Sequence, residues 1–265
     1  MGRPPSLYSF PSIDELAPSL RRFVLDAQNE AVKRQRTFRV AVSGGSLPKT
    51  LAKALFNVQS NGFDDDKVRF DQWEIFYADE RCVPLTDDDS NHKLINDEVL
   101  SRIPEGSPKP KTYPINEAYL DDPQEMADDY EKTLVSVFAA RDSVRMPHFD
   151  LILLGCGPDG HTCSLFPDHE LLREKDAWVL SLDNAPKPPP KRITLSLPVV
   201  VHAAKIGFVA TGEGKREVLR KIFETDQGRE LPCGLVNEQA GGSVSWFCDD
   251  AAADTIRFPR RPSIV

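Results

Sequence analysis

The chain has 265 residues, of which 40% are hydrophobic and 28% are charged, and its formal net charge is −8. This length accommodates one large α/β domain, and a chain of this size buries roughly three quarters of its unfolded surface. The acidic balance argues against nucleic acid or an anionic membrane as the main partner, although an anionic substrate needs only a local cluster of cations.

The cysteines and the N-terminal residues bear on the compartment. The five cysteines form no CxxC pair and are odd in number, which is typical of a reducing cytosol. The first ten residues have neither a basic nor an apolar signal region, and no apolar run reaches the length of a membrane span. We therefore expect a soluble, cytoplasmic protein. Gly2 matches a myristoylation pattern, but Pro4 and Pro5 make the match a poor one.

The first predicted elements are a long helix and a strand. Ser12 and Glu15 match a capping box, and apolar residues then recur at helical spacing, which predicts a helix over 12–36. The alternating, β-branched residues of 38–42 predict a strand.

A glycine-rich turn follows this strand and leads into a helix over 47–56 that has Pro48 in its first turn. Backbone N–H groups converge at such a helix N-terminus, and the serine hydroxyls can add donors, so the turn suits phosphate. A plain tight turn explains the same residues equally well. The turn consists of Ser43, Gly44, Gly45 and Ser46.

A second predicted strand, 73–77, ends in charged residues, which places them at a carboxyl edge of the sheet; a solvated turn would also explain them. The charged residues are Asp79, Glu80 and Arg81. Ser90 and Asn91 are caps for a helix that runs to about Leu100, and helical periodicity continues over 123–141.

The segment 149–167 holds the strongest candidate for chemistry. A dense apolar run predicts a buried strand, and glycines directly after it are followed by Asp159 and His161. Histidine titrates near neutral pH and serves as a general base or acid, and a neighbouring carboxylate orients its ring. A histidine that merely caps a short helix is the alternative.

Strands are also predicted at 178–182, 193–195, 205–210 and 244–247. A proline-rich loop carries Lys191 and Arg192 onto the second of these strands, and Lys215 follows the third. Alternation of strands and helices predicts an α/β fold with a single doubly wound, mostly parallel sheet flanked by helices. We expect one domain over 1–265, with flexible tails at 1–11 and 259–265.

Three other chemistries fit the sequence less well. Gly155-x-Gly157-x-x-Gly160 matches a dinucleotide fingerprint, but Pro167 leaves too little room for its helix. The spacing of cysteines and histidines near His161 does not match the usual zinc pairs, so no metal is expected. A G-x-S-x-G nucleophile elbow is absent, which disfavours a serine triad.

The motifs together resemble the 6-phosphogluconolactonases of the glucosamine-6-phosphate deaminase/6-phosphogluconolactonase family. The resemblance spans about Phe38 to Ala252, and its most specific part is the DGHT-x-SLFP run. It rests on VSGGS at 42–46, ADER at 78–81 with Ser90-Asn91, the run at 155–167, Arg192-Ile193-Thr194 and Gly214-Lys215. It implies the fold shared with glucosamine-6-phosphate deaminase and ribose-5-phosphate isomerase. It also implies hydrolysis of 6-phosphogluconolactone to 6-phosphogluconate in the oxidative pentose phosphate pathway.

Roles follow from the resemblance residue by residue. His161 matches the general base, with Asp159 beside it. The positions expected to hold the phosphate or line the pocket are Ser43, Gly44, Gly45, Ser46, Asp79, Arg81, Asn91, Arg192 and Lys215. No cofactor or metal is implied, because a lactone is already activated toward water.

Two rival functions remain on the same fold. An amino-sugar phosphate deaminase or isomerase would use Asp79 to abstract a proton, whereas a non-catalytic sensor would bind the sugar phosphate without turnover. The expected partner is a small phosphorylated sugar lactone, with neither nucleic acid nor membrane, and the expected state is a monomer or weak homodimer.

Overall fold

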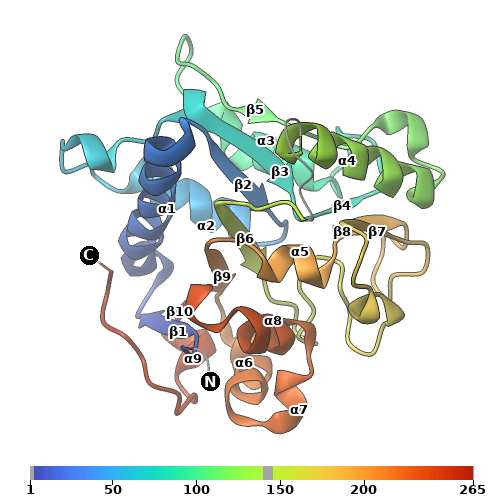
Figure 1. Ribbon diagram of the computed structural model, residues 1–265. Coiled ribbons are helices and arrows are strands. Elements are labelled where there is room, and N and C mark those ends of the chain that lie inside the picture. The colour runs from blue at the N-terminus through green and yellow to red at the C-terminus, as the bar shows by residue number, and fades with distance from the viewer. Residues whose placement is uncertain (1–2, 140–145, 265) are drawn as a thin grey trace.

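A seven-stranded sheet occupies the centre of residues 3–139 and 146–264, the part of the chain that the computed structural model describes (Figure 1). Every pairing between neighbours in this sheet is parallel, in the order β1-β10-β9-β6-β2-β3-β5. Its strands are β1 (Ser6–Phe10), β2 (Phe38–Val42), β3 (Trp73–Tyr77), β5 (Lys111–Thr112), β6 (Leu151–Gly155), β9 (Ile206–Ala210) and β10 (Val244–Asp249).

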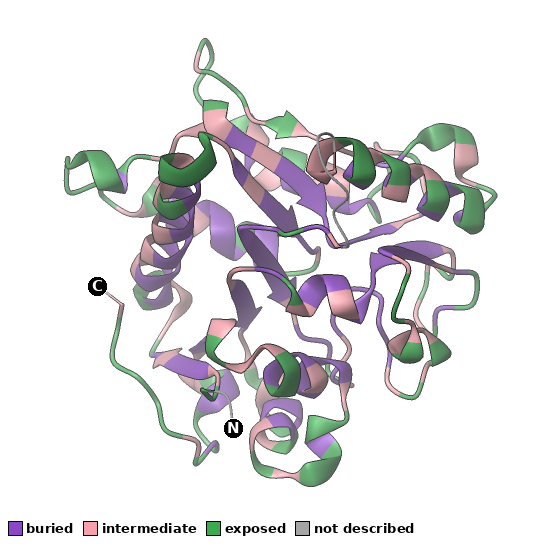
Figure 2. Ribbon diagram, viewed as in Figure 1, coloured by how far each residue is buried: buried purple, intermediate pink, exposed green. Residues whose placement is uncertain are grey.

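Helices cover both faces of the sheet, because alternate residues of each central strand point to opposite sides. Val40 and Val42 pack with α1 (Ile13–Gln35), α2 (Leu47–Ala52) and α3 (Asn91–Glu98) in one apolar cluster. Ala41 joins the cluster on the other side. That cluster contains residues of α4 (Pro123–Phe138), α5 (Leu197–Val201), α6 (Arg216–Glu224) and α8 (Pro232–Ala240). Figure 2 shows the resulting pattern, with buried strands inside and exposed helix faces outside.

The strand order reverses between β2 and β6. From β2 the chain continues outward through β3 and β5, and from β6 it continues in the opposite direction through β9 and β10. Open α/β sheets bind ligands at the carboxyl ends of such a pair, since the connections leave in opposite directions and open a crevice. The Ser43 amide spans this point by donating to the Leu153 carbonyl over 3.0 Å.

The predicted doubly wound, mostly parallel sheet is confirmed, but the expectation of a single sheet needs a correction. A separate antiparallel sheet contains β4 (Asp79–Arg81), β8 (Arg192–Leu195) and β7 (Val179–Leu182), in that order. Short apolar strands look alike in sequence whichever sheet they join, and Asp79 to Arg81 look like a charged turn. The small sheet brings Asp79 beside Thr194.

Both predicted tails also need correction. Ser6–Phe10 pair in parallel with β10, and the Arg261 amide donates to the Leu7 carbonyl over 2.8 Å. The Ser19 and Ser263 hydroxyls lie 2.6 Å apart, which ties the C-terminal segment to α1. These contacts are made with residues distant in sequence, so local composition gave no sign of them. Gly2 and the predicted helix end at Arg141 lie outside the described residues.

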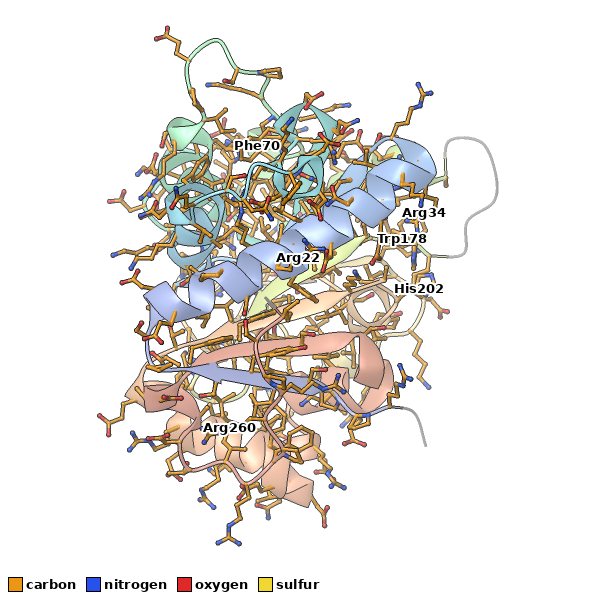
Figure 3. All side chains as sticks on the ribbon, turned by 90° about the vertical axis from the view of Figure 1, so that its left-hand side faces the viewer. Arg22, Arg34, Phe70, Trp178, His202 and Arg260 are labelled. Atoms are coloured by element: carbon orange, nitrogen blue, oxygen red, sulfur yellow. The ribbon has the colours of Figure 1, made fainter. Side chains whose placement is uncertain are left out.

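The long first helix is confirmed, with Ser12 as its cap. Figure 3 looks onto α1 as it crosses the sheet, with Arg22 and Arg34 along it. Arg34 forms an ion pair with the buried Asp150 just before β6. Among the described residues, no helix combines the length and apolar character that a membrane span requires.

Arg21 anchors α1 from inside the protein and provides a test of the packing. Its Nε donates to Asp66 Oδ1 over 2.9 Å and its Nη1 to the Leu55 carbonyl over 2.8 Å, and the residue is 5% exposed. Removing one partner of a buried pair leaves a charge uncompensated, so Arg21→Ala should lower the free energy of unfolding by about 3–5 kcal/mol in urea denaturation. Arg22→Ala is the matched control. Its surface pairs with Asp26 and Asp65 should contribute less than about 1 kcal/mol, and equal losses would contradict the prediction.

Candidate active site

A cleft of about 320 Å³ opens where the strand order reverses, at the carboxyl ends of β2, β6 and β9. The predicted site residues that line it are Ser43, Gly44, Gly45, Ser46, Asp79, Arg81, His161, Arg192 and Lys215. Asn91 and Asp159 are not lining residues; they contact lining residues instead. The structure therefore brings together side chains that lie up to 172 positions apart, counted from Ser43 to Lys215.

The 43–46 turn has an open side toward the cleft. Gly45 has φ +74°, and a Cβ atom there would meet nothing within 4 Å. Gly44 faces the protein, because a Cβ atom there would lie 1.9 Å from Asn91 Oδ1. Asn91 therefore supports the turn from behind, and its Nδ2 also donates to the Asp79 carbonyl over 2.8 Å.

The Asp79 carboxylate joins two loops of the cleft. Its Oδ1 accepts a hydrogen bond from the Ser43 hydroxyl over 2.6 Å, and its Oδ2 accepts one from the Ser164 hydroxyl over 2.9 Å. Asp79 is 4% exposed, so these bonds compensate the loss of water around the carboxylate. From the sequence, Ser43 and Asp79 were expected to contact the ligand, and Ser164 had no expected role.

The histidine and its carboxylate are held by a sharp turn after β6. Gly157 donates its amide to the His161 carbonyl over 2.8 Å, and Gly160 adopts φ +85°. His161 Nδ1 lies 2.5 Å from Asp159 Oδ1. An ionised carboxylate only accepts hydrogen bonds, so Nδ1 carries the hydrogen and Nε2 of the neutral ring keeps an acceptor lone pair.

The surroundings set the charge states of this pair. Burial lowers the pKa of His161, against the raising effect of Asp159. Partial burial acts to raise the pKa of Asp159, but the hydrogen bond and charge of His161, with Lys187, bring it to about 2. At neutral pH the pair is therefore a neutral imidazole beside a carboxylate. This is the protonation state that a general base requires.

Lys187 is a site residue that the sequence analysis missed. It belongs to the proline-rich loop, lines the cleft, and places Nζ 3.0 Å from Asp159 Oδ1 and 3.3 Å from His161 Nδ1. Only Lys191 and Arg192, the two cations that end this loop, were expected near the site from the sequence. The sequence gave little indication of a site role for Lys187, because a lysine in a proline-rich loop is usually exposed to solvent.

Arg192 lines the cleft, but most of its donors are engaged by the protein. Its Nε donates to the Pro189 carbonyl, and its Nη2 donates to the carbonyls of Lys187 and Pro188. Its Nη1 lies 3.3 Å from the Ser164 hydroxyl. Arg192 is thus first an anchor of the proline-rich loop, a role that its type and position in the sequence did not indicate.

Two other cations keep donors available. Arg81 Nη1 donates to the Asp89 carbonyl over 2.7 Å, but its buried Nε finds no partner in the described part of the chain. Lys215 ends the 3-10 turn Glu213–Lys215 after β9, and no ion pair or hydrogen bond from residues 3–139 or 146–264 engages its ammonium group. Both side chains suit an anionic group in the cleft.

Glu80 is a buried carboxylate that supports the cleft without lining it. It is fully buried, and its carboxylate accepts the amides of Asn91 over 2.7 Å and His92 over 2.8 Å. Burial raises the pKa of Glu80 to about 7, even though these amides favour the charged form. Glu80 had no expected site role from the sequence; its carboxylate fixes Asn91 at the start of α3.

Among the described residues, the His161 ring makes no hydrogen bond to a serine, threonine or cysteine side chain that it could activate as a nucleophile. Ser43 and Ser164 donate to Asp79 and not to His161. Burial raises the pKa of the Cys163 thiol well above its ordinary value, so this lining thiol stays protonated. The arrangement favours activation of a water molecule over covalent catalysis.

Comparison with known proteins links this cleft to one family. The family model described as glucosamine-6-phosphate isomerases/6-phosphogluconolactonase matches residues 11–246. A protein of Schizosaccharomyces pombe named probable 6-phosphogluconolactonase is 47% identical over 252 residues, covering 94% of this chain and 95% of that protein. The human protein named 6-phosphogluconolactonase is 40% identical over 257 residues, covering 96% of this chain and 95% of that protein.

Solved structures agree on the fold. The 6-phosphogluconolactonase of Trypanosoma cruzi superposes with a TM-score of 0.78 at 25% identity, covering 97% of this chain and 98% of that one. A monomeric glucosamine-6-phosphate deaminase superposes with a TM-score of 0.69 at 19% identity, covering 94% and 99%. At that identity the deaminase shows a shared fold alone.

Gly157 tests how the His161–Asp159 pair is held. A Cβ atom at Gly157 would lie 2.0 Å from His161 Nδ1 and 2.6 Å from Asp159 Oδ1, so Gly157→Ala must displace the pair. A displaced ring loses its burial, and the pKa of His161 should rise toward about 6.5, the value of free histidine. An NMR titration of the histidines checks this. Gly214→Ala is the control, since its Cβ would meet nothing within 4 Å; an unmoved His161 in Gly157→Ala would refute the prediction.

Proposed function

The chain belongs to the glucosamine-6-phosphate isomerase/6-phosphogluconolactonase family, and on this basis we propose that it hydrolyses 6-phospho-D-glucono-1,5-lactone to 6-phospho-D-gluconate. This reaction is a step of the oxidative pentose phosphate pathway. The observation that supports it most directly is the His161 ring, whose Nδ1 is held by Asp159 while Nε2 keeps its lone pair. A neutral, oriented imidazole beside an anion-binding cleft is what water-mediated lactone hydrolysis requires.

In the proposed mechanism His161 removes a proton from water. Nε2 accepts this proton as the water oxygen attacks the lactone carbonyl carbon, and the Asp159 carboxylate stabilises the imidazolium that forms. The imidazolium then returns the proton to the ring oxygen as the bond between that oxygen and the carbonyl carbon breaks. This transfer returns His161 to its neutral form, and the new carboxylic acid releases its remaining proton to solvent and leaves as a carboxylate.

The phosphate is held away from the reacting carbon in this proposal. Residues 44–46 of the turn, Arg81 and Lys215 line the cleft, and each of them follows or belongs to a strand other than β6, which precedes His161. Binding energy from a remote phosphate orients the lactone toward the base, which converts affinity into rate. Arg192 contributes mainly by fixing the loop between these groups.

The rival deaminase or isomerase would require Asp79 as a proton acceptor on the substrate. Both oxygens of that carboxylate accept serine hydroxyls, and the residue is 4% exposed. We therefore assign Asp79 a positioning role. Release of ammonia from glucosamine 6-phosphate would favour the rival, and tight sugar-phosphate binding without turnover would favour a non-catalytic sensor.

We further propose that the enzyme acts in the cytoplasm without a nucleic acid or membrane partner, as a monomer or weak homodimer. The net charge of −8 supports the absence of nucleic acid and membrane partners, since anionic polymers and surfaces would be repelled. Light scattering over a range of concentrations tests the second part.

His161→Ala should lower kcat by about 10²–10⁴ and leave KM for the lactone nearly unchanged, because the base acts mainly in the transition state. A coupled assay that follows 6-phosphogluconate formation measures both constants. His148→Ala serves as control, since His148 is exposed and its Nδ1 lies 2.9 Å from the His202 carbonyl, outside the cleft. Retention of kcat by His161→Ala would exclude His161 as the base.

Lys215→Ala should mainly raise KM, by about tenfold or more, because a charge-assisted hydrogen bond to phosphate contributes about 1.5–3 kcal/mol. Steady-state kinetics with the phosphorylated lactone gives the value. The exposed Lys221 of α6 provides a matched lysine-to-alanine control whose KM should stay at the wild-type value. If KM does not change in Lys215→Ala, Lys215 has no part in phosphate binding.

A further inference from the structure

The proline-rich loop carries a cation to the side of the His161 ring that faces away from its free nitrogen. Lys187 Nζ lies 3.0 Å from Asp159 Oδ1, the same oxygen that His161 Nδ1 contacts at 2.5 Å. The ammonium is also 3.3 Å from Nδ1 itself. Two donors therefore share one carboxylate oxygen, and two groups that can both be positive lie within hydrogen-bond distance of each other.

The loop that carries Lys187 is fixed by the protein. Arg192 donates to the carbonyls of Lys187, Pro188 and Pro189 over 2.8, 3.0 and 2.9 Å. Arg192 is 3% exposed, and the Ala185 amide donates to the Pro190 carbonyl over 3.0 Å, which closes the loop. Three carbonyls bound to one buried guanidinium hold the loop, so the Lys187 backbone has a defined place above the cleft.

The position of the Lys187 ammonium affects protonation of His161. When the imidazole takes a proton, the new positive charge forms beside an ammonium group, which opposes protonation. Sharing Oδ1 with Lys187 also leaves Asp159 a weaker partner for the imidazolium.

We propose that Lys187 is a positioning residue that keeps His161 neutral, by sharing the Asp159 carboxylate with the ring and by opposing formation of the imidazolium. The inference rests on the proposed function, in which His161 must be neutral to accept a proton from water. It goes beyond that function by naming a group that acts together with burial to keep a histidine beside a carboxylate from being protonated. Lys187 touches the base and its carboxylate, so its effect on the reaction passes through them.

Other groups around His161 do not replace this effect. The charges nearest to it are those of Asp159, Lys187 and Asp79, and both carboxylates raise the pKa of His161 while Lys187 lowers it. The remaining ionisable residues that line the cleft are Arg81, Cys156, Cys163, Arg192 and Lys215, and the Cys233 thiol contacts the His161 carbonyl. Burial is the largest cause that lowers the pKa of His161, and the charge of Lys187 acts in the same direction. Lys187 is the cation in direct contact with the ring among the described residues.

The test compares Lys187→Met with Lys191→Met. Both changes remove one positive charge from the same loop, but Lys191 Nζ donates to the Asp121 carbonyl over 2.7 Å and does not contact His161. The first readout is an NMR titration of the imidazoles, which is tractable because the chain has only five histidines and His161→Ala identifies the relevant signal. The second readout is the dependence of kcat/KM on pH.

The sign of the expected change follows from the charges. Loss of Lys187 raises the pKa of His161, so the acid limb of kcat/KM, where activity is lost as the base becomes protonated, moves to higher pH. Lys187→Met should therefore lose several-fold more activity at about pH 5.5 than at about pH 8.5. Lys187→Arg keeps the charge and should restore the wild-type limb, and Lys191→Met should not move it.

An unmoved His161 titration in Lys187→Met, or an equal shift in Lys191→Met, would overturn the inference. An equal loss of activity at all pH values would also overturn it, because a merely structural role has that signature. Failure of the proposed function is separate, since it would be seen as absence of lactone hydrolysis by the wild type. In that case the NMR titration still decides whether Lys187 controls the charge of His161.

Discussion

The hydrogen bonds that Ser43 and Ser164 donate to the Asp79 carboxylate are the constraint on which the cleft depends. Ser43 follows β2, Ser164 lies in the loop after β6, and Asp79 begins the small sheet. One buried carboxylate therefore fixes three segments that no single element positions. Each oxygen has a hydroxyl partner, and no ion pair from residues 3–139 or 146–264 contacts this carboxylate. Loss of either hydroxyl would leave part of a buried carboxylate unsatisfied, which is costly at 4% exposure.

The small antiparallel sheet extends this constraint to the proline-rich loop. Pairing of β4 with β8 sets Arg81 opposite Arg192, and Arg192 then holds the loop that carries Lys187. The positions of Arg81, Arg192 and the loop that carries Lys187 thus all depend on one short strand pair. The crevice lies at the carboxyl ends of the parallel strands, and the small sheet places Asp79, Arg81 and Arg192 along it.

Local patterns predicted the parts of the fold that depend on local physics. Apolar periodicity and the Ser12 cap specify α1, and the buried runs of β2, β3, β6 and β9 were found at their places in the chain. His161 and the 43–46 turn, which the resemblance singled out, line the same cleft, and their roles stay predictions. Long-range pairing could not be predicted in the same way. The residues of β1, β4 and β7 acquire their partners only when distant strands meet, and the roles of Lys187 and Arg192 depend on a loop path that prolines restrict but do not define.

The C-terminal segment has a consequence for how copies of the chain meet. β1 is an outer strand of the large sheet, and an outer strand offers unpaired backbone groups to any neighbouring chain. Here Arg260 pairs with Leu7 in an isolated parallel bridge, and the Arg261 amide donates a hydrogen bond to the Leu7 carbonyl. The opposite outer strand, β5, has two residues and presents the exposed Lys111. Both outer strands of the large sheet are therefore poor partners for a strand of a second molecule. At high protein concentration, copies of this acidic chain should meet through their side chains and not through backbone pairing between sheets.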